Sequence, residues 1–216
     1  QIWIGDKIMP GYCQAFCDEI KREHEKLGYE YKLWGNEAFD QYKDDIFLQS
    51  YLKNPKLYKW AYISDRLRLL LLRDYGGMHV DVDCKMIKSF DNIYEQLNSN
   101  ITYFCGARQE ARIDQYPLAV VGSSKNSRIV NVMLNSYKDV RWANGGAMLA
   151  AEMIANIDPD IAVFNYRRFY DMELTEDTIV LHDPHKLKSW WRTKEDMKNL
   201  WGGTAKSSLE ALNKLN

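Results

Sequence analysis

Two aspartates one residue apart, Asp81 and Asp83, are the residues whose types and spacing most directly indicate chemistry. They follow a Gly-Gly pair, and over residues 78–83 apolar side chains alternate with His79 and the two aspartates. An extended strand places alternate side chains on one face, so the pattern predicts that His79, Asp81 and Asp83 point the same way, with the two carboxylates roughly 6.5 Å apart. One carboxylate is then suited to hold a hard divalent cation, while the other holds a sugar hydroxyl or a metal-bound water.

Most Asp-x-Asp pairs are solvated surface or turn residues. Here the two negative charges stand at a predicted strand end beside apolar residues, where they repel each other unless a cation compensates them. Clusters of carboxylates with perturbed titration favour functional sites, so we interpret Asp81 and Asp83 as a metal and substrate site.

Asp65 and Arg68 lie three residues apart on one face of a predicted long helix. One interpretation is a surface ion pair that contributes about 0–1 kcal/mol. The helix around them is rich in leucine, however, and charged groups in apolar surroundings need partners. We therefore favour a functional role for both residues.

A second cluster lies near the C-terminus. His182, Asp183 and His185 fall within four residues at a predicted strand end, and any of them is a candidate to complete a metal shell. Manganese accepts imidazole as well as oxygen ligands, whereas magnesium prefers oxygen. Farther on, Ser189 and Trp190 carry O–H and Nε1–H groups that can donate to a leaving diphosphate.

These residues resemble a known family, the glycosyltransferases with a sugar-binding DXD region. It includes yeast-type initiating mannosyltransferases, bacterial capsule glycosyltransferases and, more remotely, the glucosylating clostridial toxins; the present chain looks family 32-like. The matching landmarks are residues 1–5, Ser64-Asp65, Arg68, Gly76-Gly77, His79, Asp81-x-Asp83 and Ser189-Trp190. They span nearly the whole chain, and its small size is similar to that of a virus-encoded minimal glycosyltransferase module.

The resemblance implies roles for individual residues. It assigns Asp83, with Asp81 and His185, to a Mn²⁺ (or Mg²⁺) ion, and Asp81 also to the ribose or a metal-bound water. It counts Asp65, Arg68, Asp81 and Asp83 as catalytic, with Asp65 accepting hydrogen bonds from donor-sugar hydroxyls and Arg68 near the sugar or diphosphate. The implied substrate-binding residues are Trp3, Ile4, Asp65, Arg68, His79, Asp81, Asn144, Gly145, Ser189 and Trp190.

Two of these assignments compete with plainer interpretations. Trp3 is implied to stack on the nucleotide base, although a tryptophan in a short strand is more often a core residue. Asn144 and Gly145 are implied to form a turn beside the acceptor, although they also suit an ordinary helix N-terminus.

Composition bounds the class of protein. The 216 residues are expected to form one domain, 1–216, with 46% hydrophobic and 27% charged residues. The net charge of −1 argues against a nucleic-acid binder. No apolar run approaches the roughly 18 residues that would span a membrane. Four scattered cysteines favour reduced thiols over a disulfide framework. A cytoplasmic protein with an incomplete N-terminus is expected.

Strand and helix patterns alternate along the chain. Strands are predicted at 1–5, 29–34, 78–82, 101–106, 118–121, 161–164 and 178–181. Helices are predicted at 10–28, 36–52, 57–74, 126–137 and 145–157 and over the last 25 or so residues. This order predicts an α/β fold with a mostly parallel central sheet flanked by helices, and the resemblance specifies the GT-A (nucleotide-diphosphosugar transferase) type. No Gly-rich phosphate-binding motif is present, so phosphates are expected to be held by a metal and side chains.

The favoured function is metal-dependent transfer of a sugar from a nucleoside diphosphate sugar to a carbohydrate acceptor, with a UDP-sugar favoured and a GDP-sugar possible. One alternative is a non-catalytic module that binds a sugar nucleotide or carbohydrate. Another is a phosphatase with a nucleophilic Asp-x-Asp, but that motif normally follows the first strand, whereas here it lies near residue 80.

Overall fold

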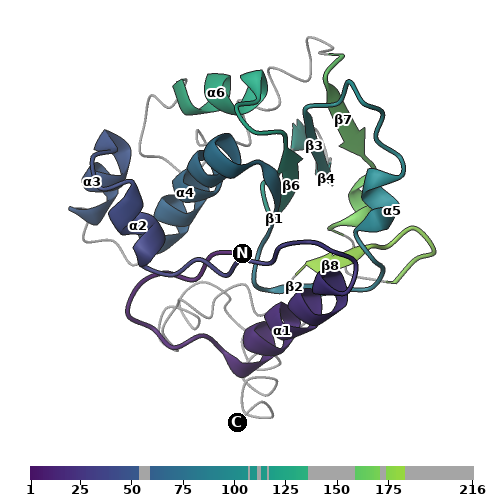
Figure 1. The fold of residues 1–216 in the computed structure, drawn as a ribbon, viewed down its shortest axis with the longest axis horizontal. Helices are drawn as coiled ribbons and strands as arrows, with labels where there is room; N and C mark the ends of the chain where they lie inside the picture. The colour runs from purple at the N-terminus through teal and green to yellow at the C-terminus, as the bar shows by residue number, and fades with distance from the viewer. Residues whose placement is uncertain are drawn as a thin grey trace.

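The computed structural model describes residues 1–53, 59–106, 108–110, 113–115, 117–135, 159–170 and 174–182. Its helices are α1 (Gly11–Glu25), α2 (Glu37–Gln41), α3 (Ile46–Leu52), α4 (Lys59–Tyr75), α5 (Asp91–Tyr94) and α6 (Arg128–Asn135), and a 3₁₀ turn covers Tyr166–Arg168. Its strands are β1 (Gly77–Val80), β2 (Cys84–Met86), β3 (Tyr103–Gly106), β4 (Arg108–Glu110), β5 (Ile113–Gln115), β6 (Val120–Ser123), β7 (Ile161–Phe164) and β8 (Val180–His182). Figure 1 shows how they are arranged.

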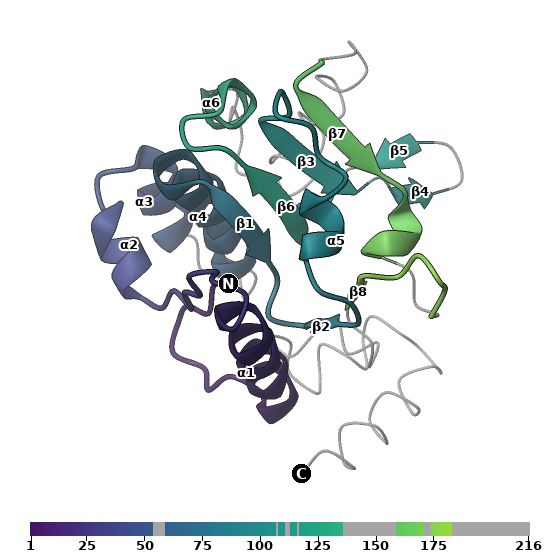
Figure 2. The ribbon, with the colours of Figure 1, turned by 45° about the vertical axis from the view of Figure 1, so that its right-hand side comes forward.

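The central sheet has the strand order β1-β6-β3-β7, which can be followed in Figure 2. β6 is antiparallel to both of its neighbours, and only β3 and β7 pair in parallel. The predicted α/β class is confirmed, but the prediction of a mostly parallel sheet is wrong. The alternation of helix and strand patterns does not fix strand direction, and here β6 lies between β1 and β3 and runs opposite to both.

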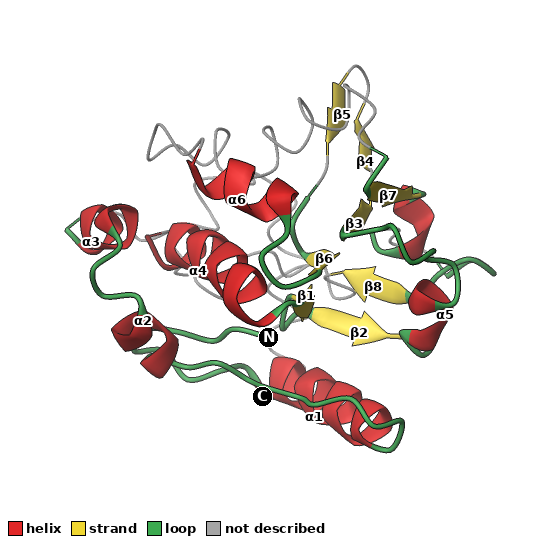
Figure 3. Ribbon diagram, turned by 45° about the horizontal axis from the view of Figure 1, so that its top comes forward, coloured by secondary structure: helices red, strands yellow, loops and turns green. Residues whose placement is uncertain are grey.

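Two short antiparallel ladders accompany this sheet. β2 pairs with β8 and β4 pairs with β5. In Figure 3 the β2–β8 ladder lies between α1 and the rest of the molecule. This ladder matters for the site because β2 begins directly after Asp83, and β8 ends at His182.

Helix α4 is the central helix of the fold. Five of its leucines, at positions 67 and 69–72, are buried, in a cluster that also contains residues of α3, α6, β3 and β6. A helix that is apolar on most of its circumference must be enclosed, and α3 and α6 pack against it. It ends at Gly76 and Gly77, which both have positive φ, as the Gly-Gly pair predicts. Within the described residues, no helix has the length and hydropathy needed to cross a membrane.

On the other side of the sheet, a buried histidine joins α1 to α5. The Nε2 atom of His24 accepts a hydrogen bond from the backbone N–H of Phe90 at 3.1 Å, and its Nδ1 lies 2.9 Å from the carbonyl oxygen of Ile20. The ring therefore carries its proton on Nδ1. It also stacks on the Phe90 ring, with the centroids 4.3 Å apart.

Several predicted elements are shorter than expected. The strands predicted at 1–5 and 29–34 are reduced to a single parallel bridge between Ile2 and Trp34. The helix predicted at 36–52 is split into α2 and α3, because Asp45 caps α3 by accepting from the backbone N–H groups of Phe47 and Leu48. The strand predicted at 78–82 ends at Val80. The helices predicted at 145–157 and in the last 25 residues lie outside the described residues.

The two glycines after α4 provide a test of the fold. A Cβ on Gly76 would lie 2.7 Å from the backbone nitrogen of Lys125, whereas nothing lies within 4 Å of a Cβ on Gly77. Gly77→Ala should lower the free energy of unfolding by about 1–2 kcal/mol, because alanine disfavours a positive φ. Gly76→Ala should lower it by roughly 1–3 kcal/mol more, because its Cβ overpacks against Lys125. Urea unfolding measures both, with Gly11→Ala as a near-neutral control because its Cβ meets nothing. Equal losses for the two glycines would contradict the close approach of Lys125.

Candidate functional site

The guanidinium of Arg68 is the centre of the predicted acidic site. Arg68 lies on α4 with only 6% of its surface exposed. Its Nη2 is 3.0 Å from Asp65 Oδ1 and 3.1 Å from Asp81 Oδ1, and its Nη1 donates to the carbonyl oxygen of Leu118 at 2.7 Å. One buried cation thus joins a carboxylate of α4 to a carboxylate that follows β1, and the structure brings together the predicted residues Asp65, Arg68 and Asp81.

Asp81 is held from three sides. Its backbone N–H donates to the carbonyl oxygen of Ala119 at 2.8 Å, which continues the pairing of β1 with β6 by one residue. Its Oδ1 is 2.9 Å from Nε2 of His79, which is 6% exposed. Because an ionised carboxylate only accepts, Nε2 carries the proton. His79 shares a face with Asp81, as predicted, but it lies buried beneath the carboxylate.

The two aspartates bound to Arg68 titrate differently. Burial raises the pKa of Asp65 to about 6, and the nearby Arg68 offsets only part of that rise. Burial also acts to raise the pKa of Asp81, but Arg68 and the hydrogen bond from His79 outweigh it and lower the pKa to about 2. Burial, together with the charge of Arg68, lowers the pKa of His79 to about 3, so that its ring is neutral near pH 7. Asp81 therefore stays ionised, whereas Asp65 changes charge near pH 6.

The chain turns immediately after Asp81. The backbone N–H of Cys84 donates to the carbonyl oxygen of Asp81 at 3.1 Å, which closes a turn over Val82 and Asp83. Val82 is buried against Cys13 and Cys17 of α1. The prediction that both aspartates extend from one face of a continuous strand is therefore wrong for Asp83, because the apolar Val82 is drawn into this small core and the strand does not continue.

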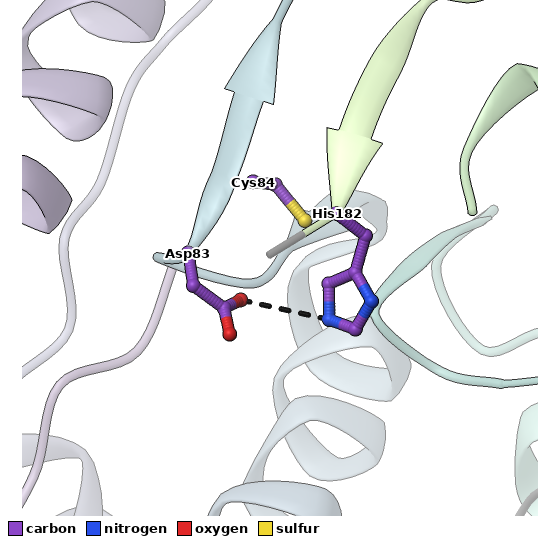
Figure 4. A group of neighbouring side chains, drawn as sticks. All are labelled: Asp83, Cys84 and His182. Atoms are coloured by element: carbon purple, nitrogen blue, oxygen red, sulfur yellow. Dashed lines mark ion pairs between the residues drawn. The ribbon is translucent and has the colours of Figure 1, made fainter. Parts of the chain in front are cut away.

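The turn places Asp83 in a second group with Cys84 and His182 (Figure 4). Nε2 of His182 lies 3.6 Å from Oδ1 of Asp83, and one candidate ligand atom from each of the three residues lies within 4.8 Å of the others. Cys84 and His182 are directly paired across the β2–β8 ladder. Burial raises the pKa of the Cys84 thiol well above its usual value, so the carboxylate and the imidazole are the main donors.

Oxygen and imidazole nitrogen donors fit a divalent cation such as Mn²⁺, which accepts both. The charges agree with this fit. Asp65, Asp81 and Asp83 contribute three negative charges when ionised, and Arg68 one positive charge, which leaves a net charge of −2 (−3 + 1). A divalent cation compensates a net charge of that size.

Of the two predicted site residues in the N-terminal segment, Trp3 packs beside the same turn. Trp3 is half-buried, packs against the cluster of Cys13, Cys17 and Val82, and donates from Nε1 to the carbonyl oxygen of Lys7 at 2.9 Å. Ile4 packs against the main core around α4. The structure thus places Trp3 against the middle residue of the Asp-x-Asp motif. Its predicted stacking on a nucleotide base stays a prediction.

The remaining predicted site residues lie outside the described residues: Asn144, Gly145, Asp183, His185, Ser189 and Trp190. The ligation by His185 stays a prediction for the same reason. Sequence reasoning did not separate His182 from its neighbours and did not place Cys84 at the site. The signal that selects His182 is its register opposite Cys84, which depends on a pairing between distant segments.

The raised pKa of Asp65 predicts a stabilising substitution. The unfolded chain releases this proton near pH 4 and the native protein near pH 6, so the contribution of Asp65 to wild-type stability falls as the pH rises between these values. His79, with its lowered pKa, acts in the opposite direction, so the effect is measured as a difference from a variant. Asp65→Asn should therefore be more stable than wild type by about 1–2 kcal/mol at pH 7 and equal to it near pH 4. Urea unfolding from pH 4 to pH 7 tests this; parallel curves would contradict the raised pKa.

Comparison with known proteins agrees with this geometry. Residues 7–100 match the family described as a glycosyltransferase sugar-binding region containing a DXD motif, and this range includes Asp65, Arg68, Asp81 and Asp83. A comparison with curated protein sequences finds no match.

Two solved structures share the fold. The PaToxG glycosyltransferase is similar with a TM-score of 0.55 and 20% identity, over 73% of this chain and 68% of that chain. A glycosyltransferase involved in the glycosylation of the major capsid of PBCV-1 is similar with a TM-score of 0.50 and 11% identity, over 97% of this chain and 98% of that chain. Residues 7–100 are therefore similar to a glycosyltransferase sugar-binding region containing a DXD motif, and the chain shares its fold with two glycosyltransferases.

Proposed function

We propose that the protein is a metal-dependent glycosyltransferase with a GT-A-type fold. It moves a hexosyl group from a nucleoside diphosphate sugar, with a UDP-sugar favoured over a GDP-sugar, to a carbohydrate acceptor. The observation that supports this most directly is the position of Asp83, which lies beside His182 and two residues after an aspartate already held by Arg68. A proposed cation donor, Asp83, and a proposed substrate-binding carboxylate, Asp81, thus lie two residues apart in the chain.

Asp83 and His182 are the residues that would hold the cation, one through a carboxylate oxygen and the other through Nε2. This donor set favours Mn²⁺ over Mg²⁺. When bound, the cation supplies positive charge that offsets the charge developing on the leaving diphosphate. Cys84 lies next to the Asp83–His182 pair and is buried. The raised pKa keeps its thiol protonated, so the thiol adds no negative charge.

Asp81 and Asp65 are proposed to bind the donor. The carboxylate of Asp81 is ionised, and contacts from Arg68 and His79 to Oδ1 fix its orientation. A remaining lone pair can accept a hydrogen bond from a ribose hydroxyl. Asp65 has about a quarter of its side chain exposed and is proposed to accept from hydroxyls of the donor sugar. Groups fixed before the substrate arrives need little reorganisation during the reaction.

Arg68 is proposed to act as a positioning residue. Its guanidinium is buried and engages two carboxylates and a carbonyl oxygen, all of them from the protein. The family resemblance implies that Arg68 lies near the sugar or diphosphate. The observed contacts instead favour a role in orienting Asp65 and Asp81. Trp3 packs against the cluster of Cys13, Cys17 and Val82 and is proposed to stack on the nucleotide base. Stacking of this kind contributes about 1–3 kcal/mol to binding.

The metal ligand Asp83 gives the main test of this function. Asp83→Asn should abolish Mn²⁺-dependent hydrolysis of a UDP-sugar and weaken Mn²⁺ binding in calorimetry at least tenfold, because an amide is a poorer ligand than a carboxylate. The matched control is Asp40→Asn, which changes an exposed aspartate of α2. Wild-type turnover by a folded Asp83→Asn protein would refute the proposed function.

A pair of histidine variants identifies the nitrogen ligand. His182→Ala should weaken Mn²⁺ binding about as strongly as Asp83→Asn does, because the structure places this imidazole beside Asp83. His185→Ala should weaken it less. Titration with Mn²⁺ followed by its electron paramagnetic resonance signal measures binding without turnover. The reverse order of effects would assign the metal to His185.

A further inference from the structure

A pocket of about 360 Å³ lies at the end of the central sheet opposite to the acidic site. Its lining includes Gly77, where β1 begins, and Tyr103, where β3 begins, whereas Asp81 follows the last residue of β1. β1 and β3 run in the same direction because each is antiparallel to β6. Gly77 and Asp81 are thus roughly 13 Å apart along an extended chain. We call this the α5 pocket, because Tyr94 of α5 lines it.

The lining of the α5 pocket is uncharged. It combines three aromatic residues, Tyr94, Tyr103 and Phe104, with hydroxyl and amide groups such as those of Thr102, Ser123 and Asn98. A phosphate or a metal ion would need a compensating charge in such a place, and none of the residues that line this pocket carries one. An uncharged ligand with both apolar and hydroxyl surfaces fits this lining.

Two glycines shape the pocket, one by admitting an aromatic ring and the other by leaving open space. A Cβ on Gly122 would lie 1.9 Å from a ring atom of Phe104, so only glycine allows this ring to pack across β6. At Gly77 nothing lies within 4 Å of the place where a Cβ would be, and the pocket is open there. Phe104 and Tyr94 meet edge to face, with their centroids 6.2 Å apart, which fixes the aromatic wall.

Two residues that line the pocket, Thr102 and Tyr103, carry a buried hydroxyl with an unmet hydrogen-bonding capacity among the described residues. Oγ1 of Thr102 is buried and has no hydrogen-bond partner among the residues that the structure describes. The neighbouring Ser123 hydroxyl already bonds backbone oxygens, that of Ser124 at 2.9 Å. A buried hydroxyl without a partner is costly, and rotation about χ1 would turn that of Thr102 toward a ligand in the pocket.

We propose that the α5 pocket binds a neutral sugar unit of a glycan, away from the site of transfer. Its volume is at the lower end of the range of about 300–1,000 Å³ found for small-molecule sites, which suits one or two sugar rings. Only a glycan several units long reaches from this pocket to Asp81, so the pocket anchors a long chain and does not hold the reacting unit. The choice of a glycan rests on the proposed function, but binding in the pocket does not require the metal site.

The test is binding of neutral oligosaccharides of glucose, mannose, galactose and N-acetylglucosamine at millimolar concentrations, followed by chemical-shift changes of backbone amides. At least one should shift amides around Thr102 and Ser124. Thr102→Val keeps the shape and removes the hydroxyl, so affinity should fall at least fivefold while the unfolding midpoint stays the same or rises. Ser124→Phe should abolish binding by filling the pocket, and Ser50→Phe, an exposed position on α3, is the control.

Three results would overturn the proposal. One is that no oligosaccharide shifts these amides. Another is that Thr102→Val and Ser124→Phe bind as wild type does. The third is that an apolar probe such as indole occupies the pocket and sugars do not. Asp83→Asn should retain sugar binding in the pocket and lose Mn²⁺ binding, so failure of the α5 pocket and failure of the proposed function give different results.

Discussion

The arrangement of the site depends on one buried guanidinium. Removing an arginine from water costs several kcal/mol, and this cost is recovered only when well-placed acceptors surround it. Arg68 has such acceptors on α4, on the segment after β1 and on the segment before β6. Because these elements meet at a single cation, none of them can shift without leaving a buried charge without its partners. The leucines around Arg68 provide the low-polarity surroundings that make these contacts strong.

Asp65 and Asp81 contact the same guanidinium but have different pKa values. Arg68 and His79 both lower the pKa of Asp81, whereas only Arg68 opposes the effect of burial on Asp65, although both aspartates contact the same Nη2 atom. The protein therefore maintains an ionised carboxylate next to one that is poised near neutrality. Asp65 accordingly reduces the stability of the fold at neutral pH, and functional residues commonly carry such a cost. Such a cost is consistent with the proposed role of Asp65 in binding the sugar.

The sequence predicts the parts of the fold and site that depend on neighbouring residues. The leucine-rich helix, its Gly-Gly end and the strand of β3 follow from local periodicity and turn chemistry, as does the shared face of His79 and Asp81. The turn at Asp83 was not predicted, because it depends on Val82 packing against α1. The direction of β6 and the position of His182 beside Asp83 depend on pairings between distant segments, which periodicity does not encode.

The β2–β8 ladder also sets the order in which the site can be assembled. Its two strands are separated by residues 87–179, and the proposed cation donors Asp83 and His182 lie at its two sides. A growing polypeptide therefore displays its acidic turn well before the imidazole emerges from the ribosome. Closing so long a loop is slow compared with local folding. Formation of the proposed cation site by both residues is consequently expected to be a late step of folding, after β8 has been synthesised and paired with β2.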